Sequence, residues 1–277
     1  MAKIALVTGA GSGIGRGIAL ALARRGFDLA LVGRHHAPLV AVAAAAHVQG
    51  VRAVTLVADL ADAPQRLMLI ECVRRELGPL DLLVNNAAVL SGGALTTFSP
   101  DEIEATVALN LTAPLLLTRL ALPDLVARGG AVVFVGSMVS LVPLPFASLY
   151  TATKAGLRGF GTALRYELEP FGVHVLVAHP PATNTAMVRG MAMAAGLTPG
   201  SRLARLADPE RIGEQIVTAL LARQHELVWL SGERLLAWGY HWLPWLVCAV
   251  LRLQRAQFAR MMAATRQKEQ PCDVTLM

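Results

Sequence analysis

The sequence predicts an α/β fold, in which a parallel sheet of about seven strands carries helices on both faces. Short apolar runs recur roughly every 24 to 50 residues through most of the chain. Longer segments with helical periodicity lie between these runs. The expected helix ends are each followed by a glycine, at Gly26, Gly50, Gly129 and Gly172. Strands that alternate with helices in this way form parallel sheets.

Six apolar segments have the length and composition of strands buried on both faces. In chain order they read KIALVTG, DLALVGR, AVTLVAD, DLLVNNA, AVVFVGS and HVLVAHP. The helices expected between and after them cover 15–26, 37–50, 63–77, 101–129, 150–172 and 208–224. A seventh strand is expected at 225–232. Together these elements predict one domain over residues 1–232.

The composition fits a large globular domain with a buried core. The chain has 277 residues, 55% apolar and 16% charged, and no linker or repeat divides it. The net charge is +6, but the arginines are scattered without interleaved aromatics, which argues against nucleic-acid binding. The three cysteines have neither disulfide nor metal-ligand spacing, and the N-terminus reads as a strand rather than a secretory signal. We therefore expect a cytoplasmic protein with free thiols and no metal site.

Polar residues gather where the predicted strands end, which is where ligands bind in such a sheet. The first of these turns, TGAGSGIG at 8–15, follows a strand and opens a helix. Its glycines permit a tight turn and let a phosphate approach the backbone N–H groups at a helix N-terminus. The turn is thus a candidate nucleotide site, although an ordinary glycine-rich β–α turn would have the same composition.

The second strand ends at Gly33 and Arg34, where NAD-binding sheets usually carry an acidic residue for the ribose hydroxyls. No carboxylate here would repel a 2′-phosphate, and Arg34 can pair with one. The pattern favours NADP(H) over NAD(H), the alternative being a merely solvated arginine. His35 and His36 are expected to be surface residues.

Asp59, at the end of the third strand, has two interpretations. Its carboxylate can reach the adenine amino group of a bound nucleotide, or it can cap the helix that follows. The sequence does not decide between them.

Tyr150 and Lys154 lie four residues apart, on one face of a predicted helix. Lys154 is one of three lysines in a chain with 22 arginines, and the other two lie near the ends. An ammonium beside a phenol lowers the pKa of the tyrosine from its reference of about 10. An arginine is bulkier and does not replace lysine at a tight site. The pair is a candidate for proton transfer, although a core tyrosine with a neighbouring lysine would have the same spacing.

These features together resemble the short-chain dehydrogenase/reductase family. Ser137 lies 13 residues before Tyr150 at a strand end, and NNAA at 85–88 and Asn110 fall in the family's order and spacing. Ser140 is a second hydroxyl near the site, but its spacing fits the family serine less well. The resemblance covers roughly residues 3–232. It implies a Rossmann-like doubly wound sheet, and hydride transfer between NADP(H) and a carbonyl or alcohol carbon.

The resemblance also implies a role for each site residue. Tyr150 is the acid/base for the alcohol proton, Lys154 lowers its pKa and holds the nicotinamide ribose, and Ser137 hydrogen-bonds the substrate oxygen. Asn110 anchors a water that passes protons to Lys154, and Thr185 binds the nicotinamide carboxamide. The cofactor contacts expected, besides Tyr150 and Lys154, are Thr8, Gly9, Gly11, Ser12, Gly13, Ile14, Gly15, Arg34, Asp59, Leu60, Asn86, Ala87, Pro180, Thr183 and Thr185.

Residues 186–207 occupy the position of the family's substrate lid. Met187, Met191 and Met193 make this segment flexible and apolar, and the residues after Ser137 are apolar too. We therefore expect a lipophilic small-molecule substrate, unless the methionines simply pack the lid against the core.

Residues 233–277 form a C-terminal extension, first apolar and then basic, that the resemblance does not explain. An uncharged stretch of 17 residues, 235–251, contains three of the four tryptophans and is interrupted by a glycine and a proline. It is short for a membrane-spanning helix. Tryptophans and the arginines that follow favour contact of 235–268 with an anionic membrane surface. The alternatives are packing in an oligomer or over the active site, and a true span.

The sequence therefore predicts a cytoplasmic NADP-dependent oxidoreductase, attached by its extension to the cytosolic face of a membrane. One rival is a nucleotide-sensing regulator that keeps the site without turnover. The other is a membrane-surface scaffold that recruits partners through the extension. A homodimer or homotetramer is expected.

Overall fold

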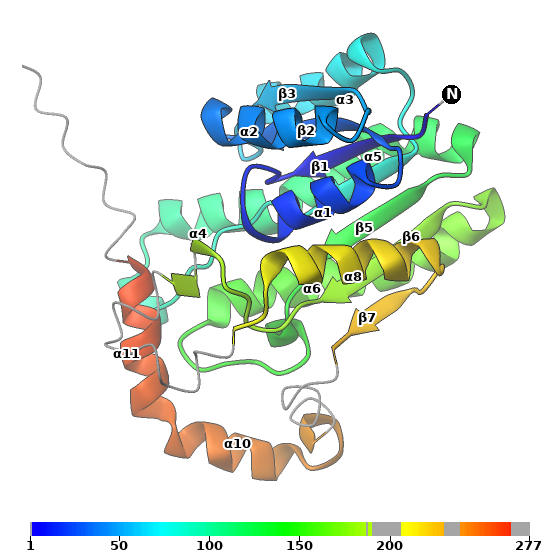
Figure 1. The fold of residues 1–277 in the computed structure, drawn as a ribbon. Helices are drawn as coiled ribbons and strands as arrows, with labels where there is room; N and C mark the ends of the chain where they lie inside the picture. The colour runs from blue at the N-terminus through cyan, green and yellow to red at the C-terminus, as the bar shows by residue number, and fades with distance from the viewer. Residues whose placement is uncertain (1, 187, 190–205, 230–238, 267–277) are drawn as a thin grey trace, which may run out of the picture.

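The computed structural model describes residues 2–186, 188–189, 206–229 and 239–266. Within them, parallel strands form a seven-stranded sheet in the order β3-β2-β1-β4-β5-β6-β7 (Figure 1). The strands are β1 Ile4–Thr8, β2 Asp28–Gly33, β3 Ala53–Val57, β4 Leu82–Asn85, β5 Ala131–Val135, β6 His174–His179 and β7 Glu226–Val228. All seven predicted strands are confirmed. The strand order reverses between β1 and β4, which is where such sheets bind ligands.

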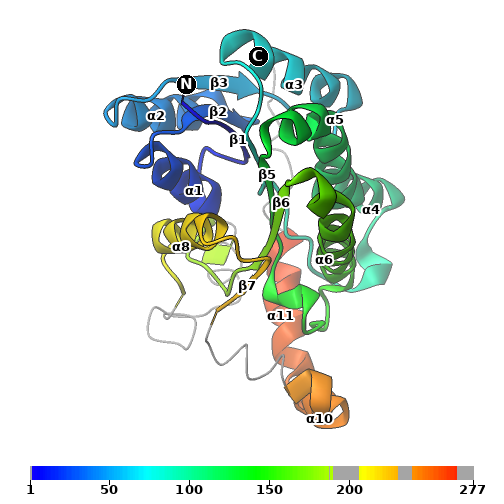
Figure 2. The same ribbon diagram turned by 90° about the vertical axis from the view of Figure 1, so that its right-hand side faces the viewer.

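Helices cover both faces of the sheet (Figure 2). One face carries α1 Gly13–Ala23, α2 His36–His47 and α8 Pro209–Leu221. The other carries α3 Ala63–Glu76, α4 Pro100–Val107, α5 Ala113–Arg128 and α6 Ser148–Leu168. Each face has its own apolar core: Leu31 of β2 belongs to the first, and the neighbouring Val32 to the second. The predicted doubly wound architecture is therefore confirmed. The short helices are η1 Leu95–Thr97, η3 Met138–Ser140 and η4 Glu169–Phe171.

The third strand differs from its prediction. It was expected to be buried on both faces, but the residues of β3 are half-buried and Val57 is exposed. The reason is topological, because β3 lies at the edge of the sheet and pairs with β2 alone.

The single helix predicted over 101–129 is interrupted. A π-helical turn, Ala108–Thr112, separates α4 from α5 and contains the fully buried Asn110. Such π-turns often occur at functional sites. Among the described residues, Pro100–Arg128 is the one stretch long and apolar enough to cross a membrane by length and composition. Here it packs against α3 and α6, as a core helix of this fold would.

The described part of the extension forms two helices, α10 Pro244–Leu253 and α11 Arg255–Arg266. Both ribbon views show α10 projecting away from the sheet (Figures 1 and 2). Val247 and Leu251 of α10 are buried against Val142, and Met262 of α11 is buried against Ala147. The extension therefore packs on the segment that follows β5. The predicted domain boundary at residue 232 lies outside the described residues.

Candidate active site

A cavity of about 680 Å³ lies at the carboxyl ends of the strands. It runs from the glycine-rich turn and Arg34 to Tyr150 and the C-terminal helix α11. Sixteen of the predicted site residues line it: Gly9, Gly11, Ser12, Gly13, Ile14, Arg34, Asp59, Leu60, Asn86, Ala87, Ser137, Tyr150, Lys154, Pro180, Thr183 and Thr185. The other three, Thr8, Gly15 and Asn110, are buried and do not line it.

The glycine-rich turn is packed too tightly for side chains. Gly9 has a φ of +64°, and a Cβ there would lie 2.9 Å from Asn86 Nδ2. A Cβ on Gly15 would lie 2.2 Å from the carbonyl oxygen of Gly9. The turn leads into α1, whose N-cap residue Ser12 makes no side-chain capping hydrogen bond. The first N–H groups of α1 are therefore available to an anion in the cavity.

Thr8 and Asn86 hold this turn against the neighbouring strand. The Thr8 hydroxyl donates to the Val84 carbonyl over 3.1 Å and accepts from the Asn86 and Ala87 N–H groups at 2.8 and 3.0 Å. The Asn86 amide donates to the Thr8 carbonyl over 2.8 Å. Because Thr8 is buried and saturated with these bonds, it positions the cavity wall rather than lining it.

Arg34 and Asp59 line the end of the cavity beside β2 and β3. Arg34 is exposed, and it follows Gly33 with no carboxylate at the strand end. The helix cap considered for Asp59 belongs instead to Asp62, whose side chain accepts from the Gln65 N–H of α3. Asp59 accepts from the Ala61 N–H over 2.9 Å and borders the cavity, as the nucleotide interpretation requires. His35, expected on the surface, is exposed but also borders the cavity.

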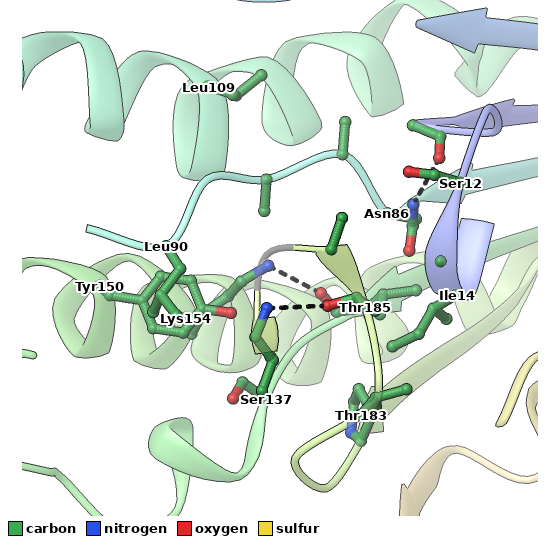
Figure 3. A pocket seen from close by; sticks show the side chains of 18 of the residues that line it. Ser12, Ile14, Asn86, Leu90, Leu109, Ser137, Tyr150, Lys154, Thr183 and Thr185 are labelled. Atoms are coloured by element: carbon green, nitrogen blue, oxygen red, sulfur yellow. Dashed lines mark hydrogen bonds between the residues drawn. The ribbon is translucent and has the colours of Figure 1, made fainter. Parts of the chain in front are cut away.

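Tyr150, Lys154 and Ser137 meet at the other end (Figure 3). Lys154 Nζ donates to the Val135 carbonyl over 3.0 Å and lies 5.8 Å from the centroid of the Tyr150 ring. Ser137 is the N-cap residue of η3 and lies two residues after the end of β5. The predicted grouping of these three side chains is therefore present in the structure.

The electrostatics of this group differ from the prediction. Burial raises the pKa of Tyr150 to about 12, and hydrogen bonding with the Ser137 side chain acts in the opposite direction. Burial also lowers the pKa of Lys154 to about 8. Lys154 is not among the causes that shift the pKa of Tyr150, and its Nζ donates to the Val135 backbone carbonyl. Tyr150 is therefore a protonated phenol at neutral pH.

Asn110 fixes the loop after β4. Its Oδ1 accepts from the Val89 N–H over 2.9 Å, and its Nδ2 donates to the Val89 carbonyl over 2.8 Å. A longer contact of 3.4 Å joins Nδ2 to the Thr153 hydroxyl on α6. The π-turn thus places Asn110 against α6, in contact with Thr153, the residue that precedes Lys154.

The far wall of the cavity comes in part from the C-terminal extension, which agrees with the alternative that the extension packs over the active site, although none of its wall residues was predicted. It is apolar, and two of its residues, Phe258 and Met262, come from α11. They lie four residues apart on one helix face, which was the available signal. The rest of this wall comes from Leu90, Val142, Leu144 and Val188. Met187, Met191 and Met193 of the predicted lid lie outside the described residues.

Comparisons with known proteins place the chain in a family. The sequence profile of the short chain dehydrogenases matches residues 3–194. Ketoacyl reductase HetN of Nostoc sp. is 31% identical over 228 residues, which cover 82% of this chain and 78% of that protein. A short-chain dehydrogenase of Sphingobium yanoikuyae, solved with NADPH, has a TM-score of 0.74 and 28% identity, covering 98% of this chain and 99% of that one. A Burkholderia cenocepacia short chain dehydrogenase, solved with NADP, has a TM-score of 0.73 and 31% identity, covering 82% and 95%.

The fold and the site thus define an oxidoreductase built on a doubly wound sheet. The chain belongs to the short-chain dehydrogenase/reductase family. The match to the Sphingobium structure extends over nearly the whole chain, so it includes the region of α10 and α11.

Proposed function

We propose that this protein is an NADP(H)-dependent reductase of lipophilic carbonyl compounds, able to run in reverse on the corresponding alcohols. The observation that carries the proposal is the grouping of Tyr150 with Ser137 and Lys154 at one end of a cavity. The other end of the same cavity holds a glycine-rich helix N-terminus and Arg34. A dinucleotide laid along the cavity would bring its reactive ring to Tyr150.

The residues present fit NADP(H). Positions 9, 13 and 15 of the first turn are glycines, so no side chain keeps a bound phosphate away from the backbone. The N-terminus of α1 has no side-chain cap and can bind a pyrophosphate. Arg34 offers a cation to a 2′-phosphate, and NADP or NADPH is present in the two solved relatives. When bound, NADPH supplies the hydride. Lys154 and Thr185, which both line the cavity, would hold its ribose and carboxamide.

Tyr150 and Ser137 perform the proton chemistry of the proposed reaction. Reduction of a carbonyl places negative charge on the substrate oxygen, and that oxygen must receive a proton. The Tyr150 phenol, with a pKa of about 12, holds this proton at neutral pH, and the Ser137 hydroxyl orients the oxygen.

Cofactor choice gives the first prediction. Arg34→Ala should raise the Kd for NADPH by about tenfold, because one charge-assisted contact with the 2′-phosphate is lost and Arg34 is exposed. The Kd for NADH should not change. Both constants are measured by quenching of protein fluorescence. Arg119→Ala, which removes an exposed arginine of α5 outside the cavity, is the control. Equal wild-type affinities for NADPH and NADH would contradict the assignment.

The substrate class follows from the wall of the cavity opposite the turn. Leu90, Val142, Leu144, Phe258 and Met262 offer a substrate no charged partner, so only apolar groups are recognised there. Phe258 and Met262 reach this wall because α11 folds back over the segment after β5. A substrate with an alkyl or ring system beside its carbonyl fits this surface.

A series of methyl ketones tests the proposed function. The kcat/KM with NADPH should rise from 2-butanone to 2-decanone, since each buried methylene contributes up to about 0.8 kcal/mol. Phe258→Ala should flatten this rise, whereas Leu253→Ala, at a side chain that is 87% exposed on α10, should leave it unchanged. NADPH oxidation by all ketones with no dependence on chain length would reject the lipophilic class. No oxidation of NADPH with ketones, aldehydes or steroid-like carbonyls would reject the function.

The extension also supports membrane attachment. On α10 and the residues before it, Trp242, Trp245 and Leu253 are 63%, 70% and 87% exposed. Leu243, Leu246 and Val250 are exposed beside them. Arg252, Arg255 and Arg260 follow, and 239–266 contains no acidic residue. An apolar face with tryptophans and flanking arginines fits the interface of an anionic bilayer. We infer peripheral contact here, since a helix of ten residues is too short to span.

Flotation with liposomes tests this contact. The wild type should float with vesicles that contain phosphatidylserine and float less with neutral vesicles. The pair Trp245→Ser/Leu253→Ser should weaken binding at least roughly tenfold, because two large apolar side chains no longer enter the interface. The pair Leu67→Ser/Met68→Ser, at exposed positions of α3, is the control. If the wild type does not float with anionic vesicles, α10 is a packing element and the membrane contact is rejected. The oxidoreductase assignment would stand.

A further inference from the structure

A buried histidine lies beside the loop at 136–142, which contains Ser137, and it has no part in the proton transfer proposed above. His179 is the last residue of β6 and is fully buried. Its Nδ1 lies 2.8 Å from the Ser140 hydroxyl, and its Nε2 lies 3.1 Å from Glu226 Oε1 of β7. Both ring nitrogens are thus engaged, and the two contacts fix the orientation of the ring.

The contacts of Ser140 determine which atom donates in the series of hydrogen bonds from Glu226 through His179 to Ser140. The Ser140 hydroxyl lies 2.5 Å from the Ser137 carbonyl, which can only accept, so the hydroxyl donates there. Its remaining contact must then be an N–H from His179 Nδ1. Glu226 Oε1 lies 3.1 Å from Nε2, and hydrogen bonding to His179 is the first cause that lowers the pKa of Glu226 to about 2, so this carboxylate accepts from Nε2. An N–H on each ring nitrogen makes the His179 ring an imidazolium that is paired with the Glu226 carboxylate. Arg158 of α6 also contacts Glu226, with Nε 3.1 Å from Oε1.

This series of hydrogen bonds ends at the backbone of Ser137. The Ser137 carbonyl accepts both from the Ser140 hydroxyl and from the Ser140 N–H, the latter over 3.0 Å. On either side, the Gly136 N–H donates to the Ala178 carbonyl over 2.7 Å and the Met138 N–H to the Pro180 carbonyl over 3.4 Å. His179 lies between these two backbone contacts. It is the one side chain of β6 that the described structure shows hydrogen-bonded to this loop.

We propose that His179 is a positioning residue for the reaction: donation from its Nδ1 to Ser140 fixes the Ser137 turn, and thereby the direction of the Ser137 hydroxyl. Glu226 and Arg158 hold the ring in place from the other side. The role rests on the proposed function, because Ser137 matters only if it orients a substrate oxygen. Misplacement of such a group by about 1 Å can lower a rate roughly 100-fold.

Three substitutions at His179 separate positioning from packing. His179→Asn places an amide N–H near the position of Nδ1 and can still donate to Ser140. His179→Gln reaches instead toward Glu226 and leaves Ser140 without its donor. His179→Phe fills the space without either bond. His174→Phe is the matched control, since His174 is also buried in β6 but lies at the opposite end of the strand.

The measurement is kcat, KM and NADPH affinity for each variant, with a reduced carbonyl substrate of the wild type. We expect His179→Gln and His179→Phe to lower kcat roughly 10- to 100-fold with NADPH affinity unchanged. His179→Asn should retain a kcat near the wild-type value, as should His174→Phe. A His179→Asn variant no more active than His179→Gln would overturn the proposal. So would losses in kcat that are matched by losses in NADPH affinity. The Asn and Gln pair suffices if His179→Phe does not fold.

Hydrogen exchange separates failure of this inference from failure of the proposed function. Backbone amides of residues 136–142 should exchange faster in His179→Gln than in His179→Asn, whether or not a substrate is known. If the wild type reduces no carbonyl but this difference is present, the proposed function fails and the positioning of the loop stands. If turnover is present and the exchange rates are equal, the inference fails alone.

Discussion

Replacing Tyr150 by phenylalanine is expected to lower kcat for carbonyl reduction roughly 100- to 10,000-fold and to leave NADPH affinity nearly unchanged. The substitution removes one hydroxyl from a buried side chain and keeps the ring. That hydroxyl is the proton donor that we propose, and burial raises its pKa to about 12. Because the variant has no hydroxyl at this position, proton transfer to the substrate oxygen should become rate-limiting.

Steady-state kinetics and fluorescence titration with NADPH measure the two quantities. Tyr166→Phe is the control, since Tyr166 lies on the same helix and is exposed. A Tyr150→Phe variant that retains turnover would remove Tyr150 from the chemistry. A wild type that binds NADPH and functions in the cell without turnover would favour the nucleotide-sensing alternative.

Replacing Lys154 by an apolar residue should lower activity and raise stability. Lys154→Met is expected to abolish most activity, because the ammonium that we propose to hold the nicotinamide ribose is lost. The same change should raise the free energy of unfolding at pH 7 by up to roughly 3 kcal/mol. The stabilisation is expected because burial lowers the pKa of Lys154 from 10.5 to about 8, which means that the buried ammonium destabilises the folded state.

The sign of the pH dependence follows from that shift. The folded state binds this proton less tightly than the unfolded state, so the cost is fully present below about pH 8. It disappears as pH rises toward the unfolded pKa, and wild type and Lys154→Met should then converge in stability. Urea unfolding at pH 7 and pH 10 measures this convergence.

Lys154→Arg distinguishes charge from shape. Arginine stays protonated and is bulkier, so the variant should lose both activity and stability. A Lys154→Arg enzyme with kcat near the wild-type value would show that a cation of any shape suffices at this position.

The sheet was predictable because each strand is a short apolar run between helical segments. Gly26, Gly50, Gly129 and Gly172 were expected after helices, and all four have positive φ angles. The edge position of β3 was not predictable, since its apolar composition is that of a central strand. Strand order, rather than composition, exposes Val57.

The site was predictable in its residues and less so in its energetics. The spacing of Ser137, Tyr150 and Lys154 brought them to one cavity end, as expected. Their pKa values depend on burial and on where Lys154 Nζ points, and a sequence contains neither. The bonds of both Asn110 amide atoms to Val89 likewise depend on the folded loop, and the water expected at Asn110 stays a prediction.

Contacts between distant segments were the least predictable part. Phe258 and Met262 form part of the substrate wall only because α11 returns to the segment after β5. His179 meets Ser140 across 39 residues of sequence. The basic, apolar extension suggested a membrane from its composition, and its second role as a cavity wall requires the folded chain.

Transfer of deuterium from the cofactor tests the proposed chemistry most directly. Wild-type protein is incubated with NADPH that carries deuterium at both C4 positions and with a lipophilic ketone such as 2-decanone, and the product is analysed by mass spectrometry. We expect an alcohol with one deuterium on the former carbonyl carbon, formed by the wild type and nearly absent with Tyr150→Phe. An alcohol without deuterium, or no alcohol from any carbonyl tested, would contradict hydride transfer at this site.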